Sequence, residues 1–360
     1  MALSDSMAEV LRLTRSGKLM EATALLQGGP GAGTSDGTPA AAGRNDALID
    51  LVSDGGVWRA KPSPASASAT PGPDKAAAAA TGQGRFEEQS WSGREGTIGY
   101  RLYHPANAMA GMPLVVMLHG CTQSPEDFAR GTGMNALADE LGFFVAYPRQ
   151  TASANAQKCW NWFKPGDQQR DRGEPALLAG ITRHVIADHA IDPARVYVAG
   201  LSAGGAAAAI MAAEYPDIYA AVGIHSGLGC GAAKDLPSAL MAMQRGGPAR
   251  RQERFVPVIT FHGDRDTTVH EANSQQIIAA ASAAAGVTLT VRVEEGRSPS
   301  GRSFTRSVSV DPAGAELIEQ WTVEGSGHAW SGGDASGSYT DPSGPEASRE
   351  MMRFFLTHRR

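Results

Sequence analysis

The sequence predicts an α/β fold in which a mostly parallel central sheet carries helices on both faces. From residue 85 onward, short apolar runs typical of buried strands alternate with longer helical segments, and this alternation favours a parallel sheet with crossover helices. One β-branched run, residues 195–199, passes through the sequence Gly-Leu-Ser-Ala-Gly directly into an alanine-rich helix. A strand that enters a helix through one glycine-flanked turn is a unit of such a sheet.

The strands and helices of this fold are expected in a definite order. The strands are aliphatic and β-branched runs, expected as two early strands within 86–103 and then at 114–118, 143–147, 195–199, 220–225, 256–262 and 317–323. The helices are longer segments, expected near 125–140, 175–189, 206–214 and 346–356. Two runs of alternating polarity, 288–294 and 303–310, predict an added hairpin before the last core strand.

The first 84 residues differ in composition from the rest of the chain. Residues 1–27 hold two short amphipathic segments, the first of which opens with the capping-box spacing of Ser6 and Glu9, and they predict a helical hairpin. Residues 28–84 are rich in Gly, Pro, Ala and Ser. That composition buries too little apolar surface to offset the cost of ordering the chain, so a largely disordered linker is expected. One domain is expected over 85–360.

Composition argues against several classes of protein. Of the 360 residues, 42% are hydrophobic and 19% are charged, which is enough for one large α/β core. The net charge of -5 argues against a nucleic-acid-binding protein, because such proteins carry an excess of basic residues. No stretch approaches the ~20 apolar residues of a membrane span. The N-terminus shows neither a basic segment before an apolar run nor a small-residue cleavage site, so a cytoplasmic location is expected.

The three cysteines leave two alternatives open. An odd number of cysteines without a secretory signal argues for reduced thiols. Cys121 and Cys159, however, fall in loops after neighbouring core strands and could lie close together at one end of the sheet. A disulfide between them therefore stays open, while Cys230 is assigned no role.

Ser202 is the candidate nucleophile. It is the centre of the Gly-x-Ser-x-Gly motif at 200–204, where the sharp strand-to-helix turn lifts its hydroxyl above the sheet. Gly200 and Gly204 let neighbouring backbone pass where a Cβ would clash. Because this strand, turn and helix form the nucleophile elbow of an α/β-hydrolase, the sequence predicts that version of the α/β fold.

A serine nucleophile needs a base, and the base needs a carboxylate to orient it. In this fold the acid follows the serine along the chain and the histidine follows the acid. Asp264 and Asp266 compete for the acid role just past the strand at 256–262, at the sheet edge where ligands bind. Asp266 is favoured, because Asp264 lies in the tight turn, where an aspartate commonly caps its own backbone.

His328 is the candidate base. Of the nine histidines only His270, His328 and His358 follow Asp266. His270 is too close to Asp266 to reach the serine independently and is expected to start a helix, while His358 lies in a charged terminal stretch. His328 lies in a glycine-rich loop after the last core strand, where the base of this fold is expected.

Two backbone N–H groups should bind the oxyanion of an acyl-transfer intermediate. One is that of Ala203, immediately after the nucleophile. The other should come from the loop after an early strand, and the strand at 114–118 is followed by Gly120 and Cys121. Gly120 permits the turn and Cys121 offers its N–H.

Five motifs, in order along the chain, resemble those of one enzyme family. From about residue 85 to 358 the chain resembles the polyhydroxybutyrate-depolymerase family of esterases, close to feruloyl and acetylxylan esterases. The matching stretches are 119–123 (His-Gly-Cys-Thr-Gln), 159–163 (Cys-Trp-Asn-Trp-Phe), 195–205, 262–269 (His-Gly-x-x-Asp-x-x-Val) and 327–330 (Gly-His-Ala-Trp). The resemblance implies Ser202 as nucleophile, Asp266 as acid, His328 as base, and Cys121 with Ala203 as oxyanion hole.

The loops at the catalytic edge should determine specificity. The long loop at 150–174 holds Trp160 and Trp162: Trp160 is expected either to stack on substrate or to pack in the local core, and Trp162 to pack in that core. Trp330, two residues after the candidate base, is expected either to line the substrate pocket or to anchor the loop that carries His328. Residues 227–254 are expected to form a small cap, with Met241 and Met243 giving it an adaptable apolar surface.

The expected function is that of a serine carboxylester hydrolase that works through an acyl-enzyme, without metal or organic cofactor. The resemblance implies short (3-hydroxy)acyl or polyhydroxyalkanoate-type esters, and its alternative is feruloyl or acetyl esters of carbohydrates. It also implies an extracellular location as the alternative to the cytoplasm. From a different class, the chain could be a noncatalytic adaptor. In either class, residues 1–27 would mediate self-association or contact with a partner or a polyester granule.

Overall fold

The computed structural model describes residues 51–54, 57–60, 84–250 and 252–360. The predicted hairpin at 1–27, with its expected role in association, and most of the predicted linker at 28–84 lie outside the described residues. Within the linker range, β1 (Leu51–Asp54) and β2 (Val57–Ala60) pair in antiparallel fashion as a two-stranded sheet.

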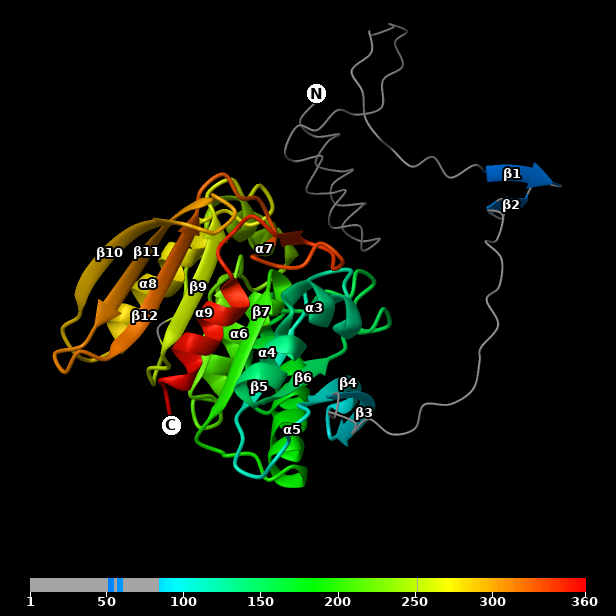
Figure 1. Cartoon of the computed structure of the whole chain (residues 1–360), viewed down its shortest axis with the longest axis horizontal. Helices are drawn as coiled ribbons and strands as arrows, with labels where there is room; N and C mark the ends of the chain where they lie inside the picture. The colour runs from blue at the N-terminus through cyan, green and yellow to red at the C-terminus, as the bar shows by residue number, and fades with distance from the viewer. Residues whose placement is uncertain (1–50, 55–56, 61–83, 251) are drawn as a thin grey trace, which may run out of the picture. The chain divides into compact units, whose positions relative to one another are not determined.

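One ten-stranded sheet organises residues 84–360, in the order β10-β11-β12-β9-β8-β7-β5-β6-β4-β3 (Figure 1). Its strands are β3 (Arg85–Gly93), β4 (Gly96–His104), β5 (Leu114–Leu118), β6 (Phe144–Pro148), β7 (Val196–Leu201), β8 (Ala221–His225), β9 (Val258–Gly263), β10 (Thr290–Arg297), β11 (Ser303–Val310) and β12 (Glu316–Val323). Parallel pairing joins the six central strands, from β12 to β6. The predicted, mostly parallel α/β-hydrolase sheet is confirmed, as is the added hairpin, β10 and β11.

Helices cover both faces of the sheet. They are α3 (Pro125–Thr132), α4 (Met134–Leu141), the short 3-10 helix η1 (Pro165–Gln168), α5 (Gly173–Asp188), α6 (Ala203–Glu214), α7 (Leu236–Arg245), α8 (Ala272–Ala284) and α9 (Ala347–Leu356). Alternate residues of a strand point to opposite faces. Leu114, Val116 and Leu118 of β5 accordingly share one core with α5, α6 and α8, while Val115 and Met117 share the other with α3, α4 and α9.

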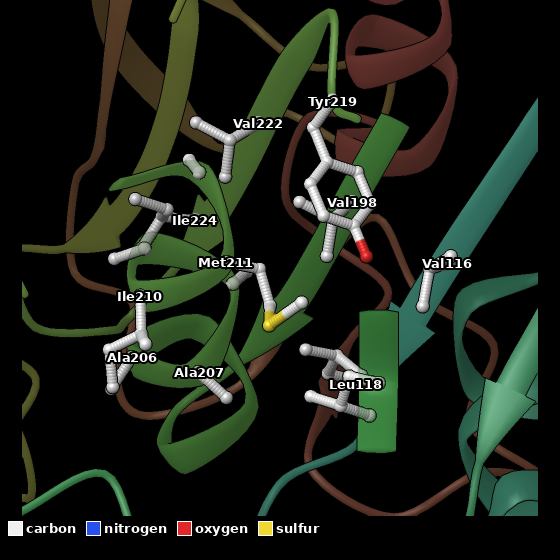
Figure 2. Close-up of a cluster of buried hydrophobic side chains, with 14 of the residues drawn as sticks. Val116, Leu118, Val198, Ala206, Ala207, Ile210, Met211, Tyr219, Val222 and Ile224 are labelled. Carbon is white, nitrogen blue, oxygen red and sulfur yellow. The ribbon is translucent and has the colours of Figure 1, made fainter. Parts of the chain in front are cut away.

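The core beneath α6 explains that helix's alanine-rich sequence. Figure 2 shows Ala207 and Met211 of α6 on the side of the helix toward Leu118 and Val198 of the sheet, and all four are buried. Small side chains let the helix axis approach the strands closely, which brings the first turn of α6 over the carboxyl ends of β5 and β7. The strand before the helix and the helix itself are therefore held in one orientation relative to the loop after β5.

Two helix predictions need correction. The single helix expected near 125–140 is two helices, α3 and α4, because Gly133 adopts the left-handed conformation (φ 64°) and both closes the first and precedes the second. A glycine adopts that conformation without a steric penalty, which ends the helix there. The helix expected to start at His270 begins at Ala272 as α8. No helix within the described part of the chain is long and apolar enough to cross a membrane.

Candidate active site

Ser202 lies on the turn between β7 and α6, in a strained backbone conformation (φ 58°, ψ -121°). A non-glycine residue rarely adopts a positive φ, and such strain is typical of functional sites. Both flanking glycines are required by close packing: a Cβ on Gly204 would collide with the carbonyl oxygen of Leu118, and one on Gly200 with that of Gly204. The tight approach of β5, β7 and α6 thus holds Ser202 at the predicted elbow.

Asp266 and His328 form a hydrogen-bonded pair. The Nδ1 atom of His328 lies 2.7 Å from Oδ2 of Asp266, and the Asp266 side chain is fully buried. The other carboxylate oxygen of Asp266 accepts hydrogen bonds from the backbone N–H groups of Thr268 (2.9 Å) and Val269 (2.8 Å). These hydrogen bonds fix the orientation of the carboxylate, which in turn orients the imidazole ring through its Nδ1 atom.

The charge of Asp266 is stabilised in place. Burial opposes ionisation of this carboxyl, but hydrogen bonds from His262 and His328 outweigh burial and keep the pKa of Asp266 well below its ordinary value. His262 Nε2 lies 3.5 Å from Asp266 Oδ2. An ionised carboxylate at this position favours the imidazole tautomer that carries its proton on Nδ1, which leaves Nε2 of His328 free to accept a proton.

The alternatives considered from the sequence lie elsewhere. Asp264 accepts a hydrogen bond from the backbone N–H of Gly325 (2.6 Å) and so ties two loops together. His270 contacts the backbone N–H of Ala272 at the start of α8. His358 makes hydrogen bonds with backbone oxygens of Phe354 and Glu316. Of the candidate acids, it is Asp266 that the structure brings to His328.

Ser202, His328, Cys121 and Ala203 line one cavity. The remaining lining residues, mostly apolar, are Gly120, Thr122, Gln123, Gln157, Cys159, Trp162, Phe163, Leu201, Leu228, Leu236, Ala239, Leu240, Met243, Thr268, Val269 and Tyr339. In the structure of the described residues, Ser202 and His328 share this cavity without a hydrogen bond between their side chains. In catalytic sites without substrate this bond is often long, and it tightens when substrate binds.

The cavity places the two predicted oxyanion donors on its wall. Ala203 is the first residue of α6, and the N–H groups in the first turn of a helix have no partner within the helix. Cys121 lies in the turn after β5 and lines the same cavity as Ala203. The partial positive charge of the helix N-terminus adds to these donors, so this part of the cavity favours a negative oxygen.

Residues 236–245 form the predicted cap as α7. Leu236, Leu240 and Met243 face the cavity. Met241, on the opposite side of the helix, is exposed and does not line the cavity. The expectation of an apolar cap is confirmed for Met243 and is wrong for Met241.

His225 connects the elbow to the loop that carries the base, a role that the sequence did not suggest. Its backbone oxygen accepts the N–H of Ser202 (2.9 Å), and its Nε2 accepts the N–H of Ser331 (2.9 Å). Burial holds the pKa of His225 well below its ordinary value, so the ring is neutral and Nε2 can accept. One buried residue thereby links the elbow that carries Ser202 to the loop that carries the base, through its backbone oxygen on one side and its ring on the other.

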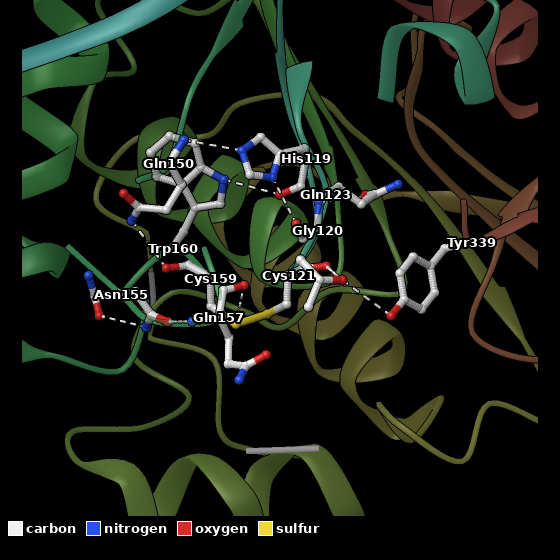
Figure 3. The surroundings of a disulfide bond; sticks show 12 residues. His119, Gly120, Cys121, Gln123, Gln150, Asn155, Gln157, Cys159, Trp160 and Tyr339 are labelled. Carbon is white, nitrogen blue, oxygen red and sulfur yellow. Dashed lines mark hydrogen bonds between the residues drawn. A yellow bond between two sulfur atoms is a disulfide. The ribbon is translucent and has the colours of Figure 1, made fainter. Parts of the chain in front are cut away.

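Cys121 and Cys159 form a disulfide that joins the turn after β5 to the loop at 150–174 (Figure 3). The alternative that the sequence left open is thus realised, while Cys230 is a free, buried thiol. The expectation of reduced thiols is therefore wrong for two of the three cysteines.

The polar groups around this disulfide hold the turn after β5 (Figure 3). His119 receives two N–H groups, from Gln150 on Nε2 (3.2 Å) and from the indole of Trp160 on its backbone oxygen (3.1 Å). Burial lowers the pKa of His119 to about 4, so the ring is neutral and Nδ1–H donates to the oxygen of Gly120 (2.7 Å). Gln123 accepts the N–H of Gly120 through its side-chain oxygen (2.8 Å). These contacts account for His119 and Gln123 in the motif at 119–123.

A buried carboxylate anchors the loop that carries Cys159. Glu174 accepts hydrogen bonds from the backbone and side-chain N–H groups of Asn161 (2.7 and 2.6 Å) and from the amide of Gln150 (2.5 Å). Burial raises the pKa of Glu174 to about 7, and the nearby charge of Asp167 acts in the same direction. The loop at 150–174 is therefore held by polar contacts beneath it as well as by the disulfide.

Of the alternatives left open for Trp160 and Trp330, the structure realises packing and loop anchoring, and the expected substrate contacts need correction. Both side chains are almost fully buried, at 0% and 1% exposure, and neither lines the cavity. The Trp160 indole N–H donates to His119, and that of Trp330 donates to Ser348 Oγ (3.0 Å). Both rings therefore pack and position the catalytic loops. The aromatic residues that do line the cavity are Trp162, Phe163 and Tyr339, and Trp162 also belongs to the buried core, as expected.

We predict that the disulfide contributes to stability. Cys159→Ser is expected to lower the free energy of unfolding by roughly 2–4 kcal/mol, because the crosslink restricts the unfolded chain over 38 residues. Denaturant unfolding under non-reducing conditions measures the change. Cys121→Ser with Cys159→Ser should add little to the single variant, and Cys230→Ser is the matched control. Equal unfolding midpoints for wild type and Cys159→Ser would contradict the crosslink.

Comparison with known proteins gives a consistent set of similarities. A family model described as Esterase PHB depolymerase matches residues 98–293. The chain is 34% identical over 238 residues to poly(3-hydroxyalkanoate) depolymerase C of Paucimonas lemoignei, an alignment that covers 62% of this chain and 56% of that protein. It is 28% identical over 218 residues to feruloyl esterase B of Thermothelomyces thermophilus, covering 55% of this chain and 74% of that protein.

Among solved structures, the acetyl xylan esterase from Aspergillus awamori has a similar fold. The TM-score is 0.55 with 18% sequence identity, over 75% of this chain and 99% of that chain. This likeness concerns the fold. The chain spans little more than half the length of the Paucimonas depolymerase. The family match includes Cys121, Ser202 and Asp266, and His328 lies beyond its end.

Proposed function

The chain belongs to the Esterase PHB depolymerase family and is an esterase, and on that premise we propose that it hydrolyses short (3-hydroxy)acyl or polyhydroxyalkanoate-type esters with Ser202, His328 and Asp266 as its catalytic triad. The observation that carries this proposal is the pair formed by Asp266 and His328 in the cavity that also holds the strained Ser202. A carboxylate, an imidazole and a serine in this chain order are the parts that acyl transfer needs.

In the proposed acylation step, Ser202 Oγ attacks the ester carbonyl carbon while Nε2 of His328 takes the hydroxyl proton. Asp266 stays ionised, holds the Nδ1 proton and stabilises the imidazolium that forms. The carbonyl oxygen becomes an oxyanion and binds to the N–H groups of Cys121 and Ala203. When the intermediate collapses, the bond to the alcohol oxygen breaks, and His328 gives its proton to the departing alkoxide.

Deacylation repeats these steps with water. His328 takes a proton from a water molecule as its oxygen attacks the acyl carbon on Ser202, and the same N–H groups bind the second oxyanion. Collapse releases the carboxylic acid and returns the proton to Ser202 Oγ. Each proton removed from a nucleophile is thus donated to a leaving oxygen.

The residues that line the cavity favour substrates with an uncharged acyl group. None of its lining residues among those described is Lys, Arg, Asp or Glu. A charged acyl chain would lose its hydration there without gaining an ion pair, which costs several kcal/mol. Leu236, Leu240 and Met243 of α7 instead offer apolar contact to a short, uncharged acyl chain.

A panel of soluble esters tests this substrate class. We expect kcat/KM for p-nitrophenyl esters to be highest for short acyl chains, and we expect 3-hydroxybutyrate oligomers to be hydrolysed. Feruloyl and acetylated carbohydrate esters are the alternative substrates, in keeping with the named activity of the Thermothelomyces relative. Higher kcat/KM for feruloyl esters than for every 3-hydroxyacyl ester would replace the proposed class with that alternative.

A further inference from the structure

Two strained residues face each other at the mouth of the cavity. Thr122 (φ 66°) comes directly after Cys121 in the turn after β5, which is called the oxyanion turn below. Tyr339 (φ 53°) lies in the segment that follows the loop carrying His328, which is called the base loop. Both line the cavity, and neither was singled out from the sequence. A positive φ is a true outlier for a β-branched or bulky residue, and such outliers gather at functional sites because the surrounding structure must hold them there.

The segment around Tyr339 is fixed from two sides. On one side, the backbone oxygen of Tyr339 accepts the N–H of Trp330 (2.7 Å), where the two-residue strands β13 (Trp330–Ser331) and β14 (Thr340–Asp341) pair. On the other side, the N–H of Ser338 donates to Asp127 Oδ1 (3.1 Å), and the Gln123 amide donates to the Ser338 oxygen (3.0 Å). Tyr339 is therefore held between the base loop and the oxyanion turn.

The ring of Tyr339 remains accessible despite this anchoring. Its residue exposure is 39%, which is high for a large aromatic residue in a chain with few aromatics. Figure 3 shows the phenol across from Cys121 and pointing toward the oxyanion turn. An aromatic ring that is rigidly held yet open to solvent at a cavity mouth is suited to contact a ligand, since little conformational entropy is lost on binding.

The O–H group of Tyr339 is available to donate a hydrogen bond to a ligand. The hydroxyl of Thr122 donates to the backbone oxygen of Cys121 (2.6 Å), so its own proton is already used. The distance between the Thr122 and Tyr339 hydroxyl oxygens is 3.4 Å, much longer than the ~2.8 Å of a good O–H···O bond. The phenol O–H can therefore turn to a better acceptor on a ligand at low cost.

We propose that Tyr339 binds the alcohol portion of the ester and donates a hydrogen bond to an acceptor oxygen on it. This inference rests on the proposed function, in which His328 protonates the departing alkoxide. The alcohol portion must then lie beside His328, and Tyr339 belongs to the segment paired with that loop. The acyl portion, attached to Ser202, then lies against the apolar residues of α7, while the alcohol portion lies toward Tyr339.

This position favours one chemical class of leaving group. An alcohol that carries its own carbonyl or ether oxygen, as each repeat of a hydroxyacyl chain does, can accept the phenol proton. A simple alkanol of the same size has no acceptor and can use only the face of the ring. Tyr339 thus discriminates oligomeric hydroxyacyl esters from alkyl esters with an identical acyl group.

The test compares two esters that share a 3-hydroxybutyryl group and differ in the alcohol. One is the methyl ester of the 3-hydroxybutyrate dimer, and the other is 2-hexyl 3-hydroxybutyrate, whose alcohol has the same chain length without acceptor oxygens. Tyr339→Phe is expected to lower kcat/KM for the dimer ester roughly three- to tenfold, the effect of one hydrogen bond, and to leave that for the hexyl ester within about twofold. Tyr339→Ala should lower both values, with the larger loss for the dimer ester.

The control removes a hydroxyl elsewhere. Tyr103→Phe deletes a phenol oxygen that bonds to Asp139, outside the cavity lining, and should leave the ratio of the two kcat/KM values unchanged. Equal losses for both esters in Tyr339→Phe, or no loss in either, would overturn the proposed hydrogen bond. Failure of the catalytic proposal would be distinct, because Ser202→Ala would then still hydrolyse both esters.

Discussion

Ser202→Ala is expected to lower kcat for a short p-nitrophenyl ester by roughly 10⁴- to 10⁶-fold, because the acyl-enzyme can no longer form. His328→Ala should cost about as much, since the hydroxyl of Ser202 is a poor nucleophile until a base removes its proton. Initial rates at saturating substrate measure both effects. Circular dichroism and unfolding midpoints show whether each variant keeps its fold.

The double variant decides whether the two residues act together. Groups that act as one unit are far from additive, so Ser202→Ala with His328→Ala should be hardly slower than either single variant. Met241→Ala is a matched control, because Met241 is exposed on α7 and does not line the cavity. If the two losses multiplied, Ser202 and His328 would act in separate steps and the triad would be wrong.

Asp266→Asn is expected to lower kcat by about 10⁴-fold while leaving the backbone in place. An amide in this position would present an N–H group to His328 Nδ1, which favours the tautomer that carries its proton on Nε2. The base would then face Ser202 with a proton where it needs a lone pair. Steady-state kinetics at neutral pH measure the loss.

Asp264→Asn is the matched control for this change. Asp264 is two residues away, and it bonds to the backbone N–H of Gly325 instead of to a histidine. The asparagine oxygen can still accept that bond, so we expect a loss of less than about tenfold. A larger loss in Asp264→Asn than in Asp266→Asn would move the acid to Asp264, in spite of the 2.7 Å contact between Asp266 and His328.

The elbow and the pair of acid and base could be predicted from sequence because their constraints are local or ordered along the chain. A buried strand, a serine between two glycines and an alanine-rich helix leave few alternatives for the backbone around Ser202. Asp266 and His328 each follow a strand whose carboxyl end must reach the same sheet edge. The alternation of strands and helices likewise predicted the central sheet, including the added hairpin.

The orientation of side chains in long loops could not be predicted in this way. Nothing in the sequence around Trp160 shows that its indole turns inward to donate to His119, whereas Trp162 and Phe163 line the cavity. Aromatic residues near a catalytic serine serve equally well as core or as substrate contacts. The choice depends on how the loop at 150–174 folds, and the hydrogen bonds of Glu174 and the disulfide at Cys159 hold that fold.

Contacts between distant segments could be predicted only in part, because the sequence raised the Cys121–Cys159 disulfide as one of two alternatives without deciding between them. The disulfide joins two loops that follow the neighbouring strands β5 and β6, but the sequence does not show whether the two sulfur atoms come within bonding distance. Tyr339 reaches the mouth through its pairing with Trp330 and through Ser338, which contacts Asp127 far away in the chain. The break at Gly133 had a local signal, since a glycine within a helical pattern is a common stop.

Covalent labelling of the serine tests the central claim most directly. A small fluorophosphonate should react with wild-type protein at one site, and peptide mass spectrometry should find the phosphonyl group on Ser202 with esterase activity lost in proportion. Ser202→Ala should take up no label, and Asp266→Asn should react far more slowly because its base is in the wrong tautomer. Stoichiometric labelling of a different residue, or full ester hydrolysis by Ser202→Ala, would contradict the proposed mechanism.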